Sequence, residues 1–292
     1  MTARVPSADF AARGWFRFPL NRRDLLESIR SGILERLQER VAEIDSLERY
    51  HEFVESDEDH FAIQKYVSDW YWDSGLGPEL LAHDVDVFRK FMGLDLHIQA
   101  RPYLRIARPG RTQDNVAVHR DTHYGGSPYE ASVHIPFTDT GLDGSLGVIS
   151  GSHIEPDSAY PYEVTENPGV SRGDAMHQMG FLYAPKRMRD EDIARVTPAG
   201  TRLGEALVFS LAIVHGQVVN RSNVTRFSTD IRLINSLAPV DWSRLEERGR
   251  YKQLAVSPMT EAARLYEAAE AADVARRDSC TATVHCRTPS RP

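Results

Sequence analysis

The spacing of apolar residues changes near residue 97, and this change limits the folds that the chain can adopt. Before it, apolar residues recur at intervals of three and four, the spacing of an amphipathic helix. Within residues 22–49 this spacing is followed by Leu25, Ile29, Ile33, Leu34 and Leu37. Residues 58–72 and 77–92 have the same character. We therefore predict an N-terminal helical layer over residues 22–92.

After residue 97 the chain consists of short apolar runs separated by Gly, Pro, Asp and Asn. The first run, residues 97–109, alternates and contains Ile, Tyr and Leu. Short runs of this kind, continuing to about residue 240, indicate antiparallel strands in a barrel or jelly roll. The sequence therefore predicts an α+β fold with a mainly β core over residues 97–240.

Three further segments complete the predicted organisation. A long mixed segment, residues 157–200, interrupts the strands, and it is either a lid over an active site or a peripheral decoration. Residues 260–277 consist of good helix formers and predict a C-terminal helix. Residues 278–292 are expected to be a disordered tail. No linker-like composition separates helices from strands, so we expect one domain over residues 1–277.

Composition excludes several classes of protein. The 292 residues carry a formal net charge of −7, which argues against a nucleic-acid-binding protein. No apolar run is long enough for a membrane span, and the N-terminus does not resemble a signal peptide, so we expect a cytoplasmic protein. The two cysteines, Cys280 and Cys286, lie in the predicted tail and do not indicate a disulfide framework. An acidic protein also favours a cationic substrate mildly, because an acidic cleft would attract one.

The candidate chemistry lies in His119, Asp121 and His215. Two residues of a strand at positions i and i+2 share one face, so His119 and Asp121 can point together into a barrel. A third ligand at the end of the apolar run 205–215 would complete a set of two histidines and one carboxylate. Such a set holds Fe(II) on one side and leaves the other side open for oxygen and a co-substrate.

A polar stripe follows eleven residues after His215. Arg226, Ser228, Asp230 and Arg232 alternate with apolar residues and would share one face of a strand. The fork of Arg226 suits a carboxylate, and Ser228 offers a second contact to an anionic co-substrate. Internal pairing of Asp230 with Arg232 is the structural alternative for the rest of the stripe.

Each motif taken alone is weak. His153 and Glu155 have the same spacing as His119 and Asp121, and His123 could compete as a ligand. A lone histidine at the end of an apolar strand is more often a buried core residue than a ligand. Only the occurrence of these motifs in one chain indicates a metal centre of this kind.

Taken together, the motifs resemble the phytanoyl-CoA dioxygenase superfamily. The resemblance rests on His119-Arg-Asp121, on residues 132–139 (SVHIPFTD), on residues 144–153 (GSLGVISGSH) and on His215-Gly216 with Arg226. It implies a double-stranded β-helix of the jelly-roll or cupin-like type. It also implies an Fe(II)- and 2-oxoglutarate-dependent oxygenase that uses O2, with His119, Asp121 and His215 as catalytic iron ligands and Arg226 on the far carboxylate of 2-oxoglutarate.

The resemblance extends to other residues. It assigns His153 to a structural turn, and it suggests that Arg101, Tyr103 or Arg105 on an early strand assists co-substrate binding. At residue 134 the family often has an aromatic residue, and the sequence has His134, which could contact a hydrophilic substrate or be a buried, hydrogen-bonded histidine. His123 is a second candidate for substrate contact.

The resemblance also limits the type of reaction and the class of substrate. Related halogenases lack the carboxylate that Asp121 supplies, so the sequence favours hydroxylation, desaturation, epimerisation or oxidative ring closure. The regions around residues 119–130 and 223–233 resemble oxygenases of aminoglycoside pathways, of the streptomycin and hygromycin type, including enzymes that form orthoesters. This resemblance implies a polar, cationic small molecule as substrate. The alternatives are a small amino acid or another metabolite.

Two other functions would use the same fold. A ligand-binding barrel without catalysis would not need the three ligands and Arg226 together. A cupin-type isomerase would use His119, His123 and His215 as metal ligands and would not need 2-oxoglutarate.

Overall fold

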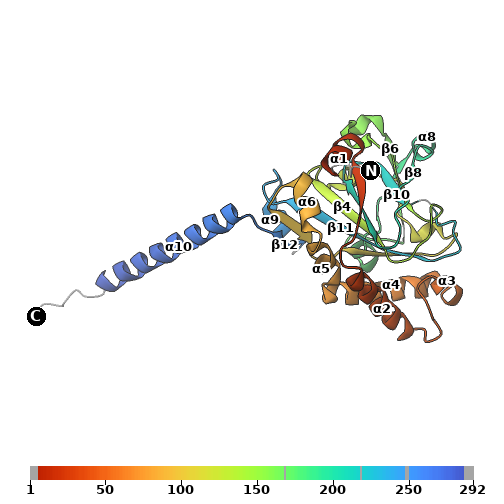
Figure 1. The fold of residues 1–292 in the computed structure, drawn as a ribbon, viewed down its shortest axis with the longest axis horizontal. Coiled ribbons are helices and arrows are strands. Elements are labelled where there is room, and N and C mark those ends of the chain that lie inside the picture. Colours follow the sequence, from red (N-terminus) through yellow and green to blue (C-terminus); the bar gives the residue numbers. More distant parts are fainter. Residues whose placement is uncertain (1–5, 168, 218, 247–249, 286–292) are drawn as a thin grey trace, which may run out of the picture. The chain divides into compact units, whose positions relative to one another are not determined.

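The computed structural model describes residues 6–167, 169–217, 219–246 and 250–285. The chain divides into two compact units, Met1–Leu254 and Ala255–Pro292 (Figure 1). No helix in the described part of the chain is both long enough and apolar enough to cross a bilayer.

A large antiparallel sheet forms the core of the first unit. Strand β11 (Arg226–Asn235) lies near its centre and pairs with β4 (Glu130–Pro136), β2 (Leu96–Gln99) and β3 (Tyr103–Ala107). The remaining strands of this sheet are β9 (Glu205–Ser210), β1 (Trp15–Pro19) and β12 (Tyr251–Ala255). Every residue of β4 is buried, so both faces of the sheet are covered there.

Two smaller antiparallel sheets accompany the large one. The first has the order β10 (His215–Gln217), β5 (Leu146–Val148) and β8 (Thr197–Pro198), and the second pairs β6 (Tyr162–Val164) with β7 (Lys186–Met188). The predicted fold class, a mainly β antiparallel core behind an N-terminal helical layer, is confirmed.

Helices α2 to α6 make up the predicted helical layer, and a further helix, α1 (Pro6–Arg13), precedes it. Their bounds are Arg23–Gln38, Tyr50–Phe53, Asp57–Ser74, Leu76–Ala82 and Val85–Met92. The first helix ends earlier than predicted. Ile44 and Leu47 continue the apolar spacing and are buried, but they lie in the irregular segment between α2 and α3. The third predicted helix is two helices, α5 and α6, that meet at His83 and Asp84.

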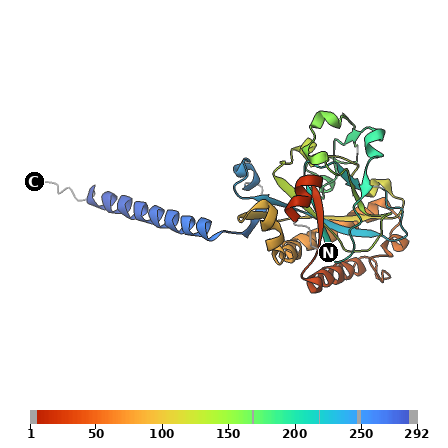
Figure 2. The ribbon, with the colours of Figure 1, turned by 45° about the horizontal axis from the view of Figure 1, so that its top comes forward.

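The helical layer packs on the apolar face of β11. The ring of Tyr50 lies edge-on to that of Phe227, with centroids 5.6 Å apart. Gln64 donates from Nε2 to the carbonyl of Leu104 on β3 at 3.0 Å. Figures 1 and 2 show α2, α3 and α4 together on one side of the large sheet. The alternate residues of β11, starting at Arg226, therefore face away from the helices.

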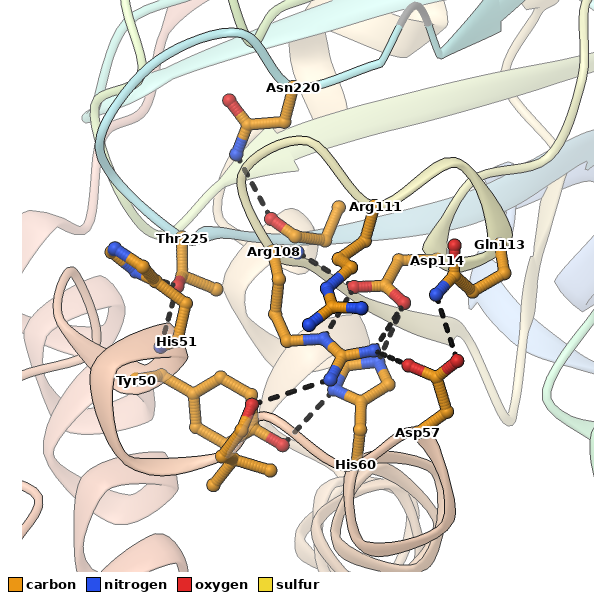
Figure 3. A network of polar contacts seen from close by, with 12 residues as sticks. Tyr50, His51, Asp57, His60, Arg108, Arg111, Gln113, Asp114, Asn220 and Thr225 are labelled. Atoms are coloured by element: carbon orange, nitrogen blue, oxygen red, sulfur yellow. Dashed lines mark hydrogen bonds and ion pairs between the residues drawn. The ribbon is translucent and has the colours of Figure 1, made fainter.

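A buried ionic network connects the same layer to the segment that leads to His119 (Figure 3). Arg108 is 1% exposed and donates to both carboxylate oxygens of Asp114 at 2.9 Å. It also donates to Asp57 Oδ1 at 2.6 Å and to three backbone carbonyls at residues 54–56. A buried cation with this many acceptors is satisfied, and it fixes the segment after β3 to the start of α4.

The segment 157–200 contains β6, β7 and β8 with two short helices, α7 (Ala175–Gln178) and α8 (Asp190–Ile193). Val170, Met179 and Phe181 form a cluster that also contacts Phe61 and Trp72 of α4. This part of the segment is thus anchored to the helical layer by apolar packing.

Near the C-terminus, α9 (Trp242–Glu246) precedes β12, and α10 spans Pro258–His285. The sequence pattern predicted that the last helix ends at residue 277, and it continues for eight residues more. The rest of the predicted disordered tail, residues 286–292, lies outside the described residues.

Candidate metal centre

The structure brings together the three residues that the sequence singled out as metal ligands. One ligand atom each of His119, Asp121 and His215 lies within 4.8 Å of the other two. His119 Nε2 is 3.5 Å from Asp121 Oδ1, and the two imidazole rings have centroids 4.5 Å apart. Two histidines and one carboxylate at this separation suit a first-row transition metal with open coordination positions.

Backbone pairing explains how these residues meet. His119 and His215 form an isolated antiparallel bridge, with N–H···O distances of 2.8 and 2.9 Å in the two directions. The amide of Asp121 then donates to the carbonyl of Leu211 at 3.1 Å, and a short 3₁₀ turn starts at Asp121. The prediction of a regular strand through His119 and Asp121 is therefore wrong, because the chain turns at Asp121 after a single bridge.

The position of His215 in its strand also differs from the prediction. The apolar run 205–215 is not one strand, since β9 ends at Ser210 and His215 begins β10 in another sheet. Gly216 permits the close approach of the two ligand segments, because a Cβ at this position would lie 2.5 Å from the Cα of Val118. The packing of the two ligand segments therefore requires a glycine after His215.

Hydrogen bonds orient both imidazoles in the same way. Nδ1 of His119 is 2.6 Å from the carbonyl oxygen of Ala117, and Nδ1 of His215 is 3.1 Å from that of Ile213. A carbonyl accepts only, so Nδ1 carries the hydrogen in each ring and Nε2 is left as a donor atom for a metal. Burial, with the neighbouring His119, lowers the pKa of His215 to about 4. His215 is therefore neutral at pH 7, as a metal ligand must be.

Asp121 is held by an arginine that the sequence analysis assigned elsewhere. Arg232 Nη2 donates to Asp121 Oδ1 at 3.0 Å. Burial alone would raise the pKa of Asp121, but Arg232 and the two histidines outweigh it and hold that pKa well below its usual range. The carboxylate is thus charged at neutral pH, and one of its oxygens already has a partner.

A cavity of about 750 Å³ opens over these ligands. Its lining includes His119, Asp121, His215, Asp230 and Arg232. One wall comes from the segment 157–200, which contributes Arg172, His177, Gln178, Gly180, Phe181, Leu182, Tyr183, Ala184 and Lys186. The volume is that of a typical small-molecule site. The segment 157–200 therefore forms part of the cavity wall.

Arg226 and Ser228 lie deeper than the cavity lining. The guanidinium of Arg226 is 1% exposed and donates to the carbonyl of Gly144 at 2.7 Å and to Asn115 Oδ1 at 2.6 Å. Burial lowers the pKa of Arg226 to about 10, so the guanidinium is still charged at neutral pH. A buried cation of this kind would stabilise a carboxylate bound beside it. Ser228 Oγ is buried and has no hydrogen-bond partner among the described residues. An unsatisfied hydroxyl on the same strand face as Arg226 fits a site for a polar ligand.

Tyr103 and Arg105 line the cavity from β3. Arg105 donates from Nη1 to the carbonyl of Met179 at 3.0 Å, and its Nε is 3.5 Å from Asp230 Oδ2. Gly180 follows Met179 with a φ of 88°, and a Cβ there would lie 2.7 Å from the Arg105 guanidinium. Arg105 therefore joins the barrel face to the backbone of the wall segment.

His134 is placed behind Asp230 rather than in the cavity. It is 2% exposed, and its Nδ1 is 2.9 Å from Asp230 Oδ1. Burial alone would raise the pKa of Asp230, but the contact with His134 and the charge of Arg105 lower it to about 2. His134 is not among the described residues that line the cavity, and the alternative of a buried, hydrogen-bonded histidine describes it. Pairing of Asp230 with Arg232 is also wrong, because each has a different partner.

His123 lines the cavity but does not join the metal cluster. Its ring lies against that of Tyr162 at 4.6 Å, and its Nε2 is 3.4 Å from Asp157 Oδ1. His153, which has the same spacing from Glu155 as His119 has from Asp121, also lies outside the metal cluster. Its Nε2 is 3.2 Å from the carbonyl oxygen of Ala11. These two histidines are therefore separate from the site of His119 and His215.

Comparison with known proteins identifies the family. The model of the phytanoyl-CoA dioxygenase (PhyH) family matches residues 31–228. The chain belongs to the phytanoyl-CoA dioxygenase family. It is therefore an Fe(II)- and 2-oxoglutarate-dependent oxygenase, as the sequence resemblance implied. No curated protein sequence matches the chain.

Solved structures with a similar fold have low sequence identity to this phytanoyl-CoA dioxygenase family member. One is the non-heme monooxygenase ThoJ in its apo form, with 19% identity, a TM-score of 0.47 and coverage of 78% of this chain and 76% of that one. The epimerase SnoN in complex with Fe³⁺, α-ketoglutarate and nogalamycin RO has 13% identity, a TM-score of 0.46 and coverage of 79% and 82%. EvdO2 from Micromonospora carbonacea var. aurantiaca, complexed with 2-oxoglutarate, has 14% identity, a TM-score of 0.45 and coverage of 82% and 95%.

Two site residues of this PhyH-family chain are not predicted from the sequence. The sequence offers Arg232 only as a partner of Asp230, although its place on the same strand face as Arg226 directs it toward the barrel interior. Asn115 gave no signal in the sequence, because its contact with Arg226 depends on a loop that Arg108 and Asp114 fix in space.

Proposed function

We propose that His119, Asp121 and His215 hold Fe(II), and that the enzyme oxidises a polar small molecule bound in the adjoining cavity. The observation that carries this proposal is the convergence of three ligand atoms from distant segments, each prepared for metal binding. The two Nε2 atoms are available because the Nδ1 atoms donate to carbonyls, and the carboxylate is ionised. Structural histidines in a core would not need this arrangement beside an open cavity.

We further propose that Arg226 and Ser228 bind the far carboxylate of 2-oxoglutarate, with Tyr103 and Arg105 assisting from β3. The buried charge of Arg226 and the unsatisfied hydroxyl of Ser228 support this assignment. Bound Fe(II), 2-oxoglutarate and O2 together supply the oxidising power of the reaction. The chain itself positions the reactants and holds the charges in place.

The segment around residues 172–186 would exclude water from the reaction. It already contacts Arg105 through the Met179 carbonyl, and the amide of Lys186 donates to Tyr124 Oη at 2.5 Å. Lys186 Nζ also donates to the carbonyl of His123. Because Tyr124 packs edge-on to the ring of His119, this wall is connected to a metal ligand.

Hydroxylation and oxidative ring closure, such as orthoester formation, are the outcomes that we favour, since Asp121 occupies the position that a halogenase leaves to chloride. A cationic aminoglycoside or aminocyclitol substrate stays a prediction from the sequence resemblance. A small amino acid or another metabolite remains the alternative substrate, and a ligand-binding barrel without catalysis is the alternative function.

An anaerobic titration tests the proposal. Fe(II) is added to the protein with and without 2-oxoglutarate, and the visible charge-transfer absorption of an iron-chelated keto acid is recorded. We expect this absorption with the unaltered protein, and we expect Arg226→Ala to weaken 2-oxoglutarate binding at least tenfold, which corresponds to about 1.4 kcal/mol. Arg187→Ala is the matched control, because Arg187 is an exposed arginine paired with Asp190. Folded, iron-loaded protein without the absorption would refute the proposal.

A further inference from the structure

The charge of the cavity is opposite to that of the whole chain. The chain has a formal net charge of −7. Among the residues that line the cavity, however, six are arginine or lysine and two are aspartate, an excess of four positive charges. A concave site concentrates the field of its own lining, so the local charges decide which ligand is attracted. The net charge of the chain is therefore a poor guide to this substrate.

The two aspartates are already matched by inner arginines. Arg232 pairs with Asp121 at 3.0 Å, and Arg105 lies 3.5 Å from Asp230. On the proposed function, Fe(II) and the dianion of 2-oxoglutarate would cancel each other in formal charge. The excess positive charge of the cavity lining therefore remains after the centre is loaded.

The lining cations that remain are Lys186, whose Nζ donates to the carbonyl of His123, and three arginines from separate segments, Arg101, Arg172 and Arg250. Arg101 and Arg172 are exposed, and Arg250 is partly buried. Arg101 follows β2, and the amide of Ala100 beside it donates to the carbonyl of Arg250 at 2.9 Å. Arg101 also lies 5.9 Å above the ring of Trp72. Within the ranges that the structure describes, none of the three forms an ion pair with a carboxylate.

Arg172 lines the same cavity from the segment 157–200. It follows Val170, whose cluster with Phe181 packs against Trp72. Trp72 in turn donates from Nε1 to the carbonyl of Pro102 at 2.6 Å, next to Arg101. Trp72 therefore connects the segments of Arg101 and Arg172, and the aromatic rings of Trp72, Phe181 and Tyr183 line the space with them.

From this arrangement we propose that the substrate is an anion. A carboxylate or phosphate group would be held by Arg101, Arg172 and Arg250, while the oxidised carbon faces His119, Asp121 and His215. Arginine suits this role because its planar fork binds either group through two hydrogen bonds. The aromatic rings would contact the part of the substrate between its acidic group and the metal centre. The proposal rests on the proposed function for the direction of binding, and it reverses the cationic substrate expected from the sequence.

Four probes that share a phenyl ring and differ in charge test the sign of the substrate's charge. The anaerobic protein is loaded with Fe(II) and saturating 2-oxoglutarate, so that the inner site is full. Benzoate, phenyl phosphate, neutral benzamide and cationic benzamidine are then titrated by calorimetry, with the charge-transfer absorption as a second readout. We expect the better anion to bind at least tenfold more tightly than benzamide, and benzamidine to bind most weakly. Comparison of benzoate with phenyl phosphate distinguishes a carboxylate from a phosphate substrate.

A double variant, Arg101→Gln with Arg172→Gln, connects the effect to these residues. We expect the ratio of the affinity for the anion to the affinity for benzamide to fall at least tenfold in this variant. The affinities for benzamide and for 2-oxoglutarate should be unchanged. Arg187→Gln removes a charge from the same segment outside the cavity lining and should keep the preference.

Preferred binding of benzamidine, equal binding of all four probes, or an unchanged preference in the double variant would overturn the anionic substrate. These outcomes leave the charge-transfer absorption in place. Loss of that absorption in the unaltered protein would instead refute the iron and 2-oxoglutarate assignment, so the two failures can be told apart.

Discussion

At the scale of single residues, the candidate centre depends on partners as much as on ligands. His119 and His215 are oriented by backbone carbonyls, and Asp121 is oriented by Arg232. Such outer partners fix the ligand geometry and are worth 10- to 100-fold in metal affinity in typical sites. His123 is near in sequence, but it faces Asp157 and Tyr162 instead.

Substitution of Asp121 and of His123 should have different effects on metal binding. We expect Asp121→Ala to weaken Fe(II) binding by more than about tenfold, because a direct ligand contributes at least as much as an outer partner. His123→Ala should keep the affinity within about threefold of the unaltered protein, well below that effect. Calorimetric titration with Fe(II) under anaerobic conditions measures both. The reverse result would favour the cupin-type isomerase with His123 as a ligand.

Loss of Arg232 should weaken the centre without removing a ligand. We expect Arg232→Met to reduce Fe(II) affinity by roughly 10-fold, since Asp121 would lose its orienting partner. Arg232→Lys should restore part of this loss, because the ammonium keeps the charge but not the fork. Far-ultraviolet circular dichroism checks that both variants fold. Affinity unchanged in the Met variant would show that Arg232 does not position Asp121.

At the scale of elements, the two faces of strand β11 have different roles. One face carries Arg226, Ser228, Asp230 and Arg232 toward the barrel interior, and the other packs on the helical layer through Phe227. The network of Arg108 and Asp114 holds the neighbouring segment in place (Figure 3). His60 belongs to this network, with Nδ1 3.1 Å from Tyr50 Oη and Nε2 3.6 Å from Asp114 Oδ1.

His60 should make the stability of the fold depend on pH. Burial lowers the pKa of His60 to about 4, despite the opposing charge of Asp114. The unfolded chain binds this proton near pH 6.5, so the free energy of unfolding should fall as the pH drops from about 6.5 to 4. The expected contribution is about 3 kcal/mol. Above pH 7 both states are neutral at this residue and the contribution is constant.

Urea unfolding at pH 7.0 and pH 4.5 measures this dependence. His60→Gln should lose less stability between the two values than the unaltered protein, although it is less stable at pH 7.0 through loss of the Tyr50 contact. The exposed His83 provides the control, and His83→Gln should keep the original dependence. Equal losses for His60→Gln and the unaltered protein would exclude His60 as the cause.

At the scale of the whole molecule, the cavity and the candidate ligands all belong to the unit Met1–Leu254. The second unit consists mainly of α10. None of the described residues that line the cavity or make up the metal cluster belongs to α10, so we expect the chemistry not to depend on this helix.

Removal of α10 should leave the centre intact. We expect a chain ending at Ser257 to bind Fe(II) and 2-oxoglutarate with affinities within about twofold of the full chain, because no lining residue is lost. Its Tm should change by less than about 3 °C, which corresponds to less than about 1 kcal/mol for a unit of this size. Differential scanning calorimetry and the anaerobic titration measure both quantities. A large loss of Tm or of affinity would show that α10 supports the first unit.

The sequence by itself determined the fold class and the identity of the three candidate ligands. Apolar spacing is a local property, so it distinguishes the helical layer from the β core without any knowledge of packing. The alternation of residues along β11 likewise predicted which side chains share a face. Residue types limit metal chemistry strongly, and this made His119, Asp121 and His215 recognisable before their positions in space were known.

Only the tertiary structure decided the partners of those residues. The pairing of Arg232 with Asp121, the place of His134 behind Asp230 and the turn at Asp121 depend on contacts between segments far apart in the chain. The positive cavity is the clearest case, because Arg101, Arg172 and Arg250 are scattered in a sequence whose net charge is negative. Net charge adds all residues equally, whereas a ligand responds to the few charges that the fold brings within a few ångströms of it.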